Sequence, residues 1–330
     1  MVSVDTVYKT VLLILNKEQR GYMTPFEFNN IATQVQREIF EAYFEELNQQ
    51  LRVPQNDSEY ANRVKNLNEK IDVFKTFNTC TGSNPFTLPQ NSITAATIAT
   101  PGTGYSTSGI PQATTIVGTG TGTDCTVDIV VAAGPGPITS FTIADGGKGY
   151  KIGDQLTIAG GGGNAVITVT SVDPTVHRLG TLIYNVNEKE IQPVQRNEYF
   201  LLNKSPLTKP TAEYPVYILE GSGVPSAPPS NVTVFPNTIT TNQVDVYYIK
   251  APEDVVWAYT TGGLQQFLYA PPGTIGTTPI SGSVDFELHN SEQTQLVIKI
   301  LFYAGVVIRD PQIVNVAAQK IQQEEMLEKQ

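Results

Sequence analysis

Few side chains in this sequence have the types and spacings that catalysis requires. The two histidines, His177 and His289, lie far apart in the chain, and we interpret each as a surface or strand-edge residue rather than an acid–base group. The two cysteines, Cys80 and Cys125, stand in different segments without the spacing of metal ligands, which favours buried thiols. Neither a Gly-Xaa-Ser-Xaa-Gly elbow nor a Walker pattern occurs. The sequence therefore predicts no catalytic residues, no cofactor and no metal.

A glycine run, Gly160–Ala165, matches two binding motifs in form only. Dinucleotide binding requires a helix after the glycines, whereas Val166–Val172 has the composition of a strand. The run also resembles a calcium-binding nonapeptide, but Asn164 stands where that motif has its Asp ligand and no third copy follows. Adjacent carboxylates such as Glu45 and Glu46 point to different sides of a helix, so we interpret them as a solvated face.

Composition and charge exclude further classes. The chain has 330 residues, of which 40% are hydrophobic and 16% charged, as in folded globular proteins. Its net charge of -10 disfavours a nucleic-acid groove, which requires clustered Lys and Arg. No export signal is expected from Val11–Leu15, a short apolar run preceded by Asp5. The longest apolar run, Leu296–Ile308, is interrupted by Lys299 and is too short for a membrane span, so we expect no membrane association.

An internal repeat organises the middle of the chain. Ile93–Tyr105 (ITAATIATPGTGY) and Ile138–Tyr150 (ITSFTIADGGKGY) align at a fixed offset of 45 residues and are identical at eight of thirteen positions. Each copy is an alternating strand that ends in Gly-Xaa-Gly-Tyr, where a tight turn needs glycines with positive φ and the aromatic ring anchors the turn on a packed face. The predicted repeat-turn residues are Gly102, Gly104 and Tyr105 in the first copy and Gly147, Gly149 and Tyr150 in the second.

The repeat lies in a segment whose composition differs from the rest of the chain. Residues 91–172 hold 16 of the 27 glycines and only six charged residues. We therefore predict an inserted, glycine-rich β-module over 91–172, with its two ends close together in space.

Helical signals dominate the N-terminal part. We predict helices over Asp5–Asn16, from Thr24 to Pro54, and over Ser58–Lys75. Thr24-Pro25-Phe26-Glu27 has the pattern of a capping box with Pro at the first helical position. The apolar positions expected to be buried on the second and third helices are Phe28, Ile31, Val35, Ile39, Tyr43 and Leu47, and Tyr60, Val64, Leu67, Ile71 and Phe74.

Short strands and then helices are expected after residue 85. Predicted strands outside the repeat begin at Phe86 and cover Arg178–Asn185, Tyr199–Leu202, Tyr214–Leu219, Val232–Phe235 and Val244–Ile249. A helix should start at Asn290 and end at Gly305, with Leu296–Ala304 packing on the N-terminal helices, and Asp310-Pro311 should begin a last helix.

The predicted fold class is α+β, a helical body from N- and C-terminal helices with a central antiparallel β-domain and a Gly-rich β-repeat insertion. The expected domains are an N-terminal helical segment (1–85), an antiparallel β-domain (86–90 and 173–289), the inserted module (91–172) and C-terminal helices (290–330) that pack on the N-terminal ones.

Three stretches carry a resemblance to a known group of proteins. They are Asn16–Phe44 (NKEQRGYMTPFEFNNIATQVQREIFEAYF), Val244–Tyr259 (VDVYYIKAPEDVVWAY) and Val284–Lys320. Together they resemble head-to-tail adaptor and ring proteins, neck or tail virion proteins of podovirus-like tailed bacteriophages, including crAss-like and marine phages. The Gly-Xaa-Gly-Tyr module is similar to repeats in many phage virion proteins.

The resemblance implies a non-enzymatic virion protein, made in the host bacterial cytoplasm and located in the neck or tail. Its implied partners are further copies of itself in a twelvefold ring, the portal protein, adjoining tail or ring proteins, and genomic DNA that passes through the lumen without specific binding. Ring, tail-tube and fibre-docking layers of the virion all remain open. The alternative is a lectin-like tail module for receptor binding or fibre docking, with Tyr105 and Tyr150 stacking on sugar. A polysaccharide lyase would need a carboxylate and histidine constellation that the sequence lacks.

The C-terminal tail is the predicted subunit contact. Its apolar stripe is thin and its end is acidic, so a helix there would gain its order from a partner. We expect the candidate interface residues Ile313, Val314, Ala317 and Ile321 to contact a neighbouring subunit or ring.

Overall fold

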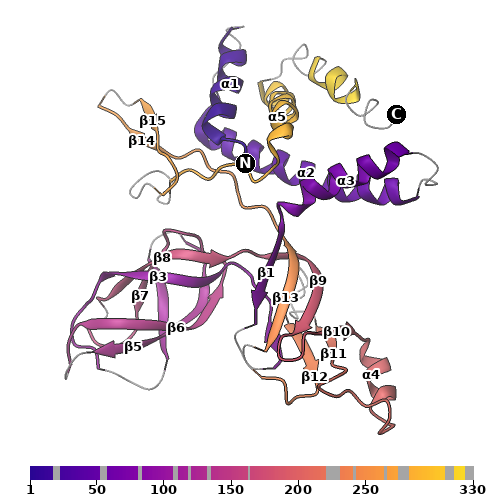
Figure 1. The fold of residues 1–330 in the computed structure, drawn as a ribbon. Coiled ribbons are helices and arrows are strands. Elements are labelled where there is room, and N and C mark those ends of the chain that lie inside the picture. Colours follow the sequence, from indigo (N-terminus) through magenta and orange to yellow (C-terminus); the bar gives the residue numbers. More distant parts are fainter. Residues whose placement is uncertain are drawn as a thin grey trace. The chain divides into compact units, whose positions relative to one another are not determined.

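The fold is given by a computed structural model, shown in Figure 1. The structure describes residues 1–17, 23–52, 58–80, 84–106, 111–117, 120–131, 135–162, 164–220, 231–240, 243–263, 266–273, 282–308 and 316–323. Helices and mostly antiparallel sheets are both present, which confirms the α+β class. The chain divides into a first unit of Met1–Phe74 with Pro252–Gln330 and a second unit of Lys75–Ala251.

The first unit brings both ends of the chain together. Its elements are α1 (Val4–Lys17), α2 (Pro25–Arg52), α3 (Ser58–Asp72), β14 (Tyr259–Thr261), β15 (Phe267–Tyr269), the short 3-10 helix η1 (Asn290–Glu292) and α5 (Gln293–Ile308). Residues 316–323 are also helical. α5 contacts α1 and α2, and its residues Leu296, Ile300 and Ala304 are fully buried. Val2 forms a β-bridge with Phe286, so an apolar core joins segments from the two ends of the sequence.

The start of α2 follows the capping box that the sequence predicts. The backbone N–H of Thr24 donates to Glu27 Oε2 at 2.9 Å, and the N–H of Glu27 donates to Thr24 Oγ1 at 3.3 Å. These reciprocal bonds satisfy two donors that a helix N-terminus leaves open, and the bond from the Thr24 backbone is the main reason that the pKa of Glu27 is lowered. α2 then continues to Arg52, close to the predicted end at Pro54.

Two helix boundaries differ from prediction. α3 ends at Asp72, and Lys75, the last residue of the predicted helix, is the first residue of the strand β1 (Lys75–Thr79). This strand pairs along its whole length with β13 (Val244–Lys250), and those tertiary hydrogen bonds outweigh the local helical signal that extended the predicted helix to Lys75. Gly305 is not a C-cap, because α5 continues to Ile308.

The second unit contains a seven-stranded sheet of order β1-β13-β9-β10-β11-β12-β2. Its further strands are β9 (Val176–Tyr184), β10 (Lys189–Pro193), β11 (Val216–Glu220), β12 (Asn231–Phe235) and β2 (Phe86–Thr87). All neighbours are antiparallel except β10 and β11, so the predicted antiparallel β-domain is a mixed sheet. One apolar cluster, which includes Phe86, Leu182, Val232 and Val244, forms its core.

The parallel pair explains why one predicted strand is a helix. Parallel strands cannot be joined by a tight hairpin, and the chain between β10 and β11 makes a crossover connection. Tyr199–Leu202, predicted as a strand, lies in that connection as part of the helix α4 (Arg196–Leu202). Tyr199 stacks on Phe235 with ring centroids 4.0 Å apart, although no residue of α4 is buried.

A second, six-stranded antiparallel sheet belongs to the same unit. Its strands are β3 (Ser92–Thr100), β4 (Gln112–Val117), β5 (Thr123–Val131), β6 (Ile138–Lys148), β7 (Gln155–Ile158) and β8 (Val166–Asp173), in the order β3-β8-β7-β4-β5-β6. It has its own apolar core, separate from that of the seven-stranded sheet. Ser92 pairs with Asp173, so the two ends of this segment are close together, as predicted.

The domain boundaries also differ from those expected. Residues 252–289, which were predicted to be part of the antiparallel β-domain, belong to the first unit. The extended stretch Glu253–Trp257 contacts α2 by hydrogen bonds, and Val255 and Trp257 are buried. Residues 75–85, assigned to the helical segment, contribute β1 to the seven-stranded sheet.

Candidate interaction surfaces

The two Gly-Xaa-Gly-Tyr turns have the same backbone conformation. Gly102 and Gly147 have φ of 66° and 61°, and Gly104 and Gly149 have φ of 77° and 75°. The tyrosine that ends each turn is 1% exposed. Only glycine adopts this left-handed region at little cost, so the sequence pattern follows directly from the turn geometry.

In the first turn, Tyr105 anchors the loop between β7 and β8. Its hydroxyl donates to Ile158 O at 2.9 Å and accepts from Ala165 N at 3.2 Å. Its backbone N–H donates to Gly136 O at 3.0 Å, just before β6 begins. The ring lies against Gly161, where an added Cβ would come within 2.8 Å of two ring carbons. The ring of Tyr105 therefore occupies the space that a side chain at position 161 would need, so its packing requires glycine there.

The second turn repeats these contacts with the loop between β4 and β5. The backbone N–H of Tyr150 donates to Asn91 O at 3.1 Å, just before β3 begins. Its ring lies against Gly122, where an added Cβ would come within 2.2 Å of the ring. Burial raises the pKa of the Tyr150 hydroxyl, which also bonds to the backbone of Cys125. The turn of each copy is thus hydrogen-bonded to a residue just before the first strand of the other copy.

The strand order has the same internal symmetry. When β3, β4 and β5 are matched with β6, β7 and β8, the order β3-β8-β7-β4-β5-β6 reads the same from either end. The first strand of each set pairs with the third strand of the other, and the middle strands β4 and β7 pair together. The end strands β3 and β6 also contact each other, and Ile138 N donates to Pro101 O at 2.9 Å. Neither set could bury its apolar face without the other.

These contacts give the turn tyrosines a structural role. Both rings are buried, so neither presents a face on which a sugar could stack. Asn164, the residue in the nonapeptide-like run, accepts from Thr103 N at 2.9 Å. Among the described residues, no group of three or more metal-ligating side chains comes together.

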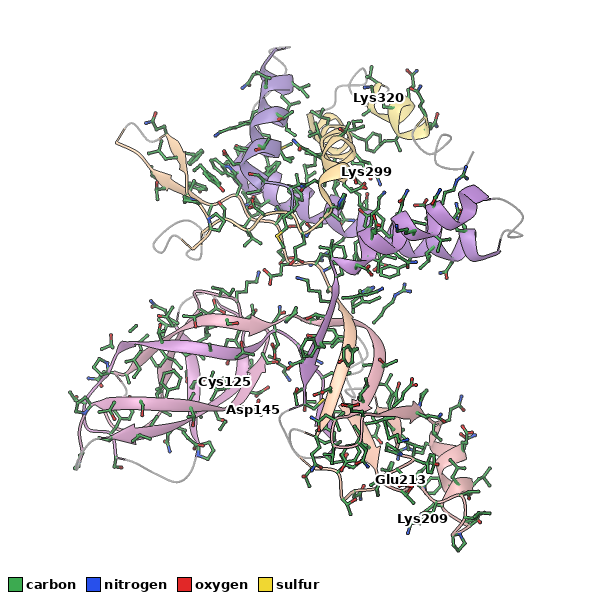
Figure 2. The ribbon with its side chains drawn as sticks, in the orientation of Figure 1. Cys125, Asp145, Lys209, Glu213, Lys299 and Lys320 are labelled. Atoms are coloured by element: carbon green, nitrogen blue, oxygen red, sulfur yellow. The ribbon has the colours of Figure 1, made fainter. Side chains whose placement is uncertain are left out.

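The remaining residues considered for chemistry are dispersed. His289 accepts from Ser291 N at the start of η1 and so acts as a helix cap, and His177 lies partly buried on β9. Cys80 and Cys125 are both buried free thiols, as expected, and burial raises the pKa of Cys80 to about 12. Figure 2 shows Cys125 among the strands of the six-stranded sheet.

One set of polar side chains on α2 has a role that the sequence did not predict. The extended chain at 253–257 forms hydrogen bonds with Asn29, Thr33 and Gln36. These side chains bond its backbone as a neighbouring strand would. Trp257 N donates to Asn29 Oδ1 at 2.8 Å, Val255 N donates to Thr33 Oγ1 at 3.1 Å, and Gln36 Nε2 donates to Glu253 O at 2.7 Å. Gln36 is fully buried and also accepts from Glu287 N at 3.0 Å. Their three- and four-residue spacing beside the apolar stripe was the available signal.

The connection between β10 and β11 carries four exposed large apolar side chains. Phe200 is 60% exposed, Leu201 65%, Leu207 94% and Tyr214 74%. Next to this connection, a cavity of about 900 Å³ is lined by the end of β10, the start of α4 and the outer half of β11. We interpret these exposed apolar side chains on one connection as part of a surface that another chain covers.

The predicted tail contacts are only partly described. Ile313 and Val314 lie outside the described residues. Ala317 is 6% exposed and Ile321 is partly buried, while Val316 on the same helix is 60% exposed. Val316 is therefore the apolar side chain of this helix that is most available to a partner.

The junction between the two sheets contains a carboxylate that titrates unusually. Asp173, at the end of β8, accepts from Asn78 Nδ2 on β1, and burial raises its pKa despite that bond. A carboxyl with a raised folded pKa binds more protons when folded. Its contribution to stability is therefore fully present below about pH 4, the unfolded value, and is lost as pH rises through the folded pKa.

Asp173→Asn should consequently stabilise the protein at neutral pH, because it removes the charge and keeps an acceptor for Asn78. We expect a gain of at most about 1 kcal/mol at pH 7, since the side chain is only partly buried, and a smaller gain as the pH falls toward 4. Urea midpoints across this range would measure it. Asp124→Asn is the control: the hydrogen bond from Lys148 lowers the pKa of Asp124, so this variant should lose stability at neutral pH. An Asp173→Asn variant less stable than the wild type at pH 7 would contradict this assignment.

No family model and no curated protein matches this chain. Within the described part of the chain, none of the helices combines the length and apolar character needed to cross a bilayer.

Proposed function

We propose that this protein is a non-enzymatic structural subunit of a phage virion, which assembles with copies of itself into a head-tail connector ring. The ring would link the portal to the tail and let DNA pass. The observation that carries the proposal is the group of exposed apolar side chains on the β10–β11 connection, Phe200, Leu201, Leu207 and Tyr214. A monomer gains no stability from apolar side chains that stay exposed to water, whereas a subunit of an assembly gains free energy by burying them against its neighbour.

The resemblance of the three sequence stretches supplies the class of assembly. Two of them lie largely in the first unit, in α2 and in the segment that leads into α5, and the third spans β13 and the stretch that α2 holds. They therefore include the buried parts of the helical unit. In this proposal the helices form the body of the connector subunit. The seven-stranded sheet is formed by residues that lie between these helices in the sequence.

In this proposal residues 91–172 are an inserted module made of two copies of one unit. Support comes from the matched turns, the matched tyrosine bonds and the symmetric strand order. Because the ends of the module are adjacent, we expect the surrounding sheet to form with or without it. The module would extend the connector without altering its core.

The acidic charge suits passage of DNA. A net charge of -10 on every copy would repel phosphate from the ring, so DNA would move through without being held. This makes the lumen a passage and not a binding site.

Negative-stain images of the purified protein test the proposal, and closed rings are the expected result. Truncation after Asp310, followed by mass photometry of the protein alone and with the portal protein, tests the tail contact in addition. We expect the truncated chain to assemble or to bind the portal less well than the full chain. Rings that form normally without the tail would remove it from the interface, and a chain that neither self-associates nor binds the portal would contradict the connector proposal.

A further inference from the structure

Leu207 projects into solvent from a turn that hydrogen bonds hold in place. The N–H groups of Thr208 and Lys209 both donate to Ser205 O, at 3.2 and 3.0 Å, and Thr208 Oγ1 donates to Leu202 O at 2.8 Å. Leu207 N donates to Ser205 Oγ at 3.3 Å, yet the residue is 94% exposed. A turn that is already ordered loses little further conformational entropy when it binds, so this leucine is suited to fill a site on another molecule.

An exposed aromatic pair lies elsewhere on the same seven-stranded sheet. Phe77 on β1 and Tyr247 on β13 are register partners, and their rings stack with centroids 5.7 Å apart and 25° between their planes. Phe77 is 65% exposed and Tyr247 is 42% exposed. On the neighbouring β9, a Cβ at Gly180 would come within 2.7 Å of Tyr247 O, which leaves no room for a side chain there. The aromatic pair therefore lies beside a position that has no side chain to cover it.

Acidic side chains border the aromatic pair on one side. Side chains two residues apart on a strand share a face, so Asp245 lies on the same face as Tyr247. Asp245 pairs with Ile183 of β9, and Ile183 pairs with Glu190 of β10, which places Glu190 in the same row across the sheet. Glu190 is exposed and Asp245 is partly buried. Asp245 and Glu190 form what we call the acidic row.

The connection that carries the exposed leucine has the opposite charge. Within Tyr199–Ala212 the charged residues are Lys204 and Lys209, and both are exposed. Figure 2 shows Lys209 on this connection, beyond α4. The basic residues Lys75 and Arg178 lie in the row on the other side of the aromatic pair, where both would repel these lysines. Charge therefore favours one orientation, with the lysines of the connection toward the acidic row.

We propose that Leu207 of one copy packs on the Phe77–Tyr247 pair of a second copy, with Lys204 and Lys209 facing the acidic row. Every copy supplies one leucine and one aromatic pair. β1 is the terminal strand of the sheet and the connection begins three strands away, after β10, so the two sites are different surfaces. A contact between different surfaces is head-to-tail and can repeat from copy to copy into a closed ring. The inference rests on the proposed function, in which the connection is buried at a subunit contact, and names the surface that receives it.

Mixing two variants of the full-length chain tests the contact. Leu207→Asp removes the leucine and keeps the aromatic pair, whereas Phe77→Asp does the reverse, so each alone should weaken self-association at least about tenfold. An equimolar mixture should form one-to-one dimers, because the intact leucine of one variant meets the intact aromatic pair of the other. Sedimentation velocity over a concentration series, with one variant fluorescently labelled, measures both results.

Ile152→Asp is the control for the added carboxylate. Ile152 is 48% exposed in the turn between β6 and β7 of the other sheet, so this variant should associate like the wild type. Leu207→Ser and Phe77→Ser repeat the mixture without an added charge. Thermal melts monitored by circular dichroism verify that every variant is folded.

Three results would overturn the contact. The first is a mixture that stays as dissociated as each variant alone, and the second is a Leu207→Asp or Phe77→Asp chain that associates as well as Ile152→Asp. Closed rings that persist in Phe77→Asp are the third, and they would leave the connector proposal intact. A wild-type chain that is monomeric at every concentration would overturn both proposals.

Discussion

Ile300→Asp is expected to unfold the whole helical unit and not only α5. Ile300 is fully buried, and its helix contacts both α1 and α2, so the carboxylate would have neither water nor a partner. We expect a loss of at least about 4 kcal/mol, a large part of the stability of an ordinary domain. Hydrogen exchange measured by mass spectrometry should show protection lost together in peptides from α1, α2 and α5.

The control for this variant lies on the same helix. Thr294 is exposed in the first turn of α5, where a carboxylate is favourable to the helix dipole, so Thr294→Asp should leave stability nearly unchanged. If α2 kept its full protection in Ile300→Asp, the shared core of the two chain ends would be refuted.

Gly147→Ala is expected to disrupt the six-stranded sheet, whereas Gly149→Ala should be tolerated. Both glycines have positive φ, which costs alanine about 1–2 kcal/mol. At Gly147 a Cβ would also come within 2.3 Å of Thr123 O and 2.7 Å of Cys125 N, both of them backbone atoms. At Gly149 the nearest atom would be 3.7 Å away, so only the backbone strain remains.

The first turn offers the same comparison in Gly102→Ala and Gly104→Ala. A Cβ at Gly102 would meet Ala165 N at 2.8 Å, and one at Gly104 would meet nothing closer than 3.5 Å. Denaturant midpoints of the four variants should therefore fall into two pairs, with the first glycine of each turn the sensitive one. Equal losses at both glycines of a turn would show that φ alone, and not the close approach of backbone, requires glycine there.

Local signals in the sequence were sufficient to predict elements that are stabilised by contacts between residues near one another in the chain. The capping box at Thr24 places the start of α2 because its bonds join residues three apart. The apolar periodicity of α2 and α5 predicts helices for the same reason. In the repeat, glycines at positive φ and the tyrosine after them are readable because one turn contains them all.

Elements held by distant partners were the ones that the sequence misassigned. β1 exists because β13 pairs with it, and α4 is a helix because the parallel strands β10 and β11 need a crossover between them. The exposure of Leu207 and the other apolar side chains of this connection was not predicted, since solvent exposure depends on what the rest of the fold leaves uncovered.

The sequence by itself determined the α+β class, the helices with a clear apolar stripe, the turn chemistry of the repeat and the closeness of the module's two ends, because these follow from residue types at short spacing. Only the tertiary structure decided that the two repeat copies exchange their first strands, and that Asn29, Thr33 and Gln36 form hydrogen bonds with the extended stretch Glu253–Trp257. The physical reason is that backbone hydrogen bonds between strands carry almost no side-chain signature. Which strands pair with one another depends on the packing of the whole unit.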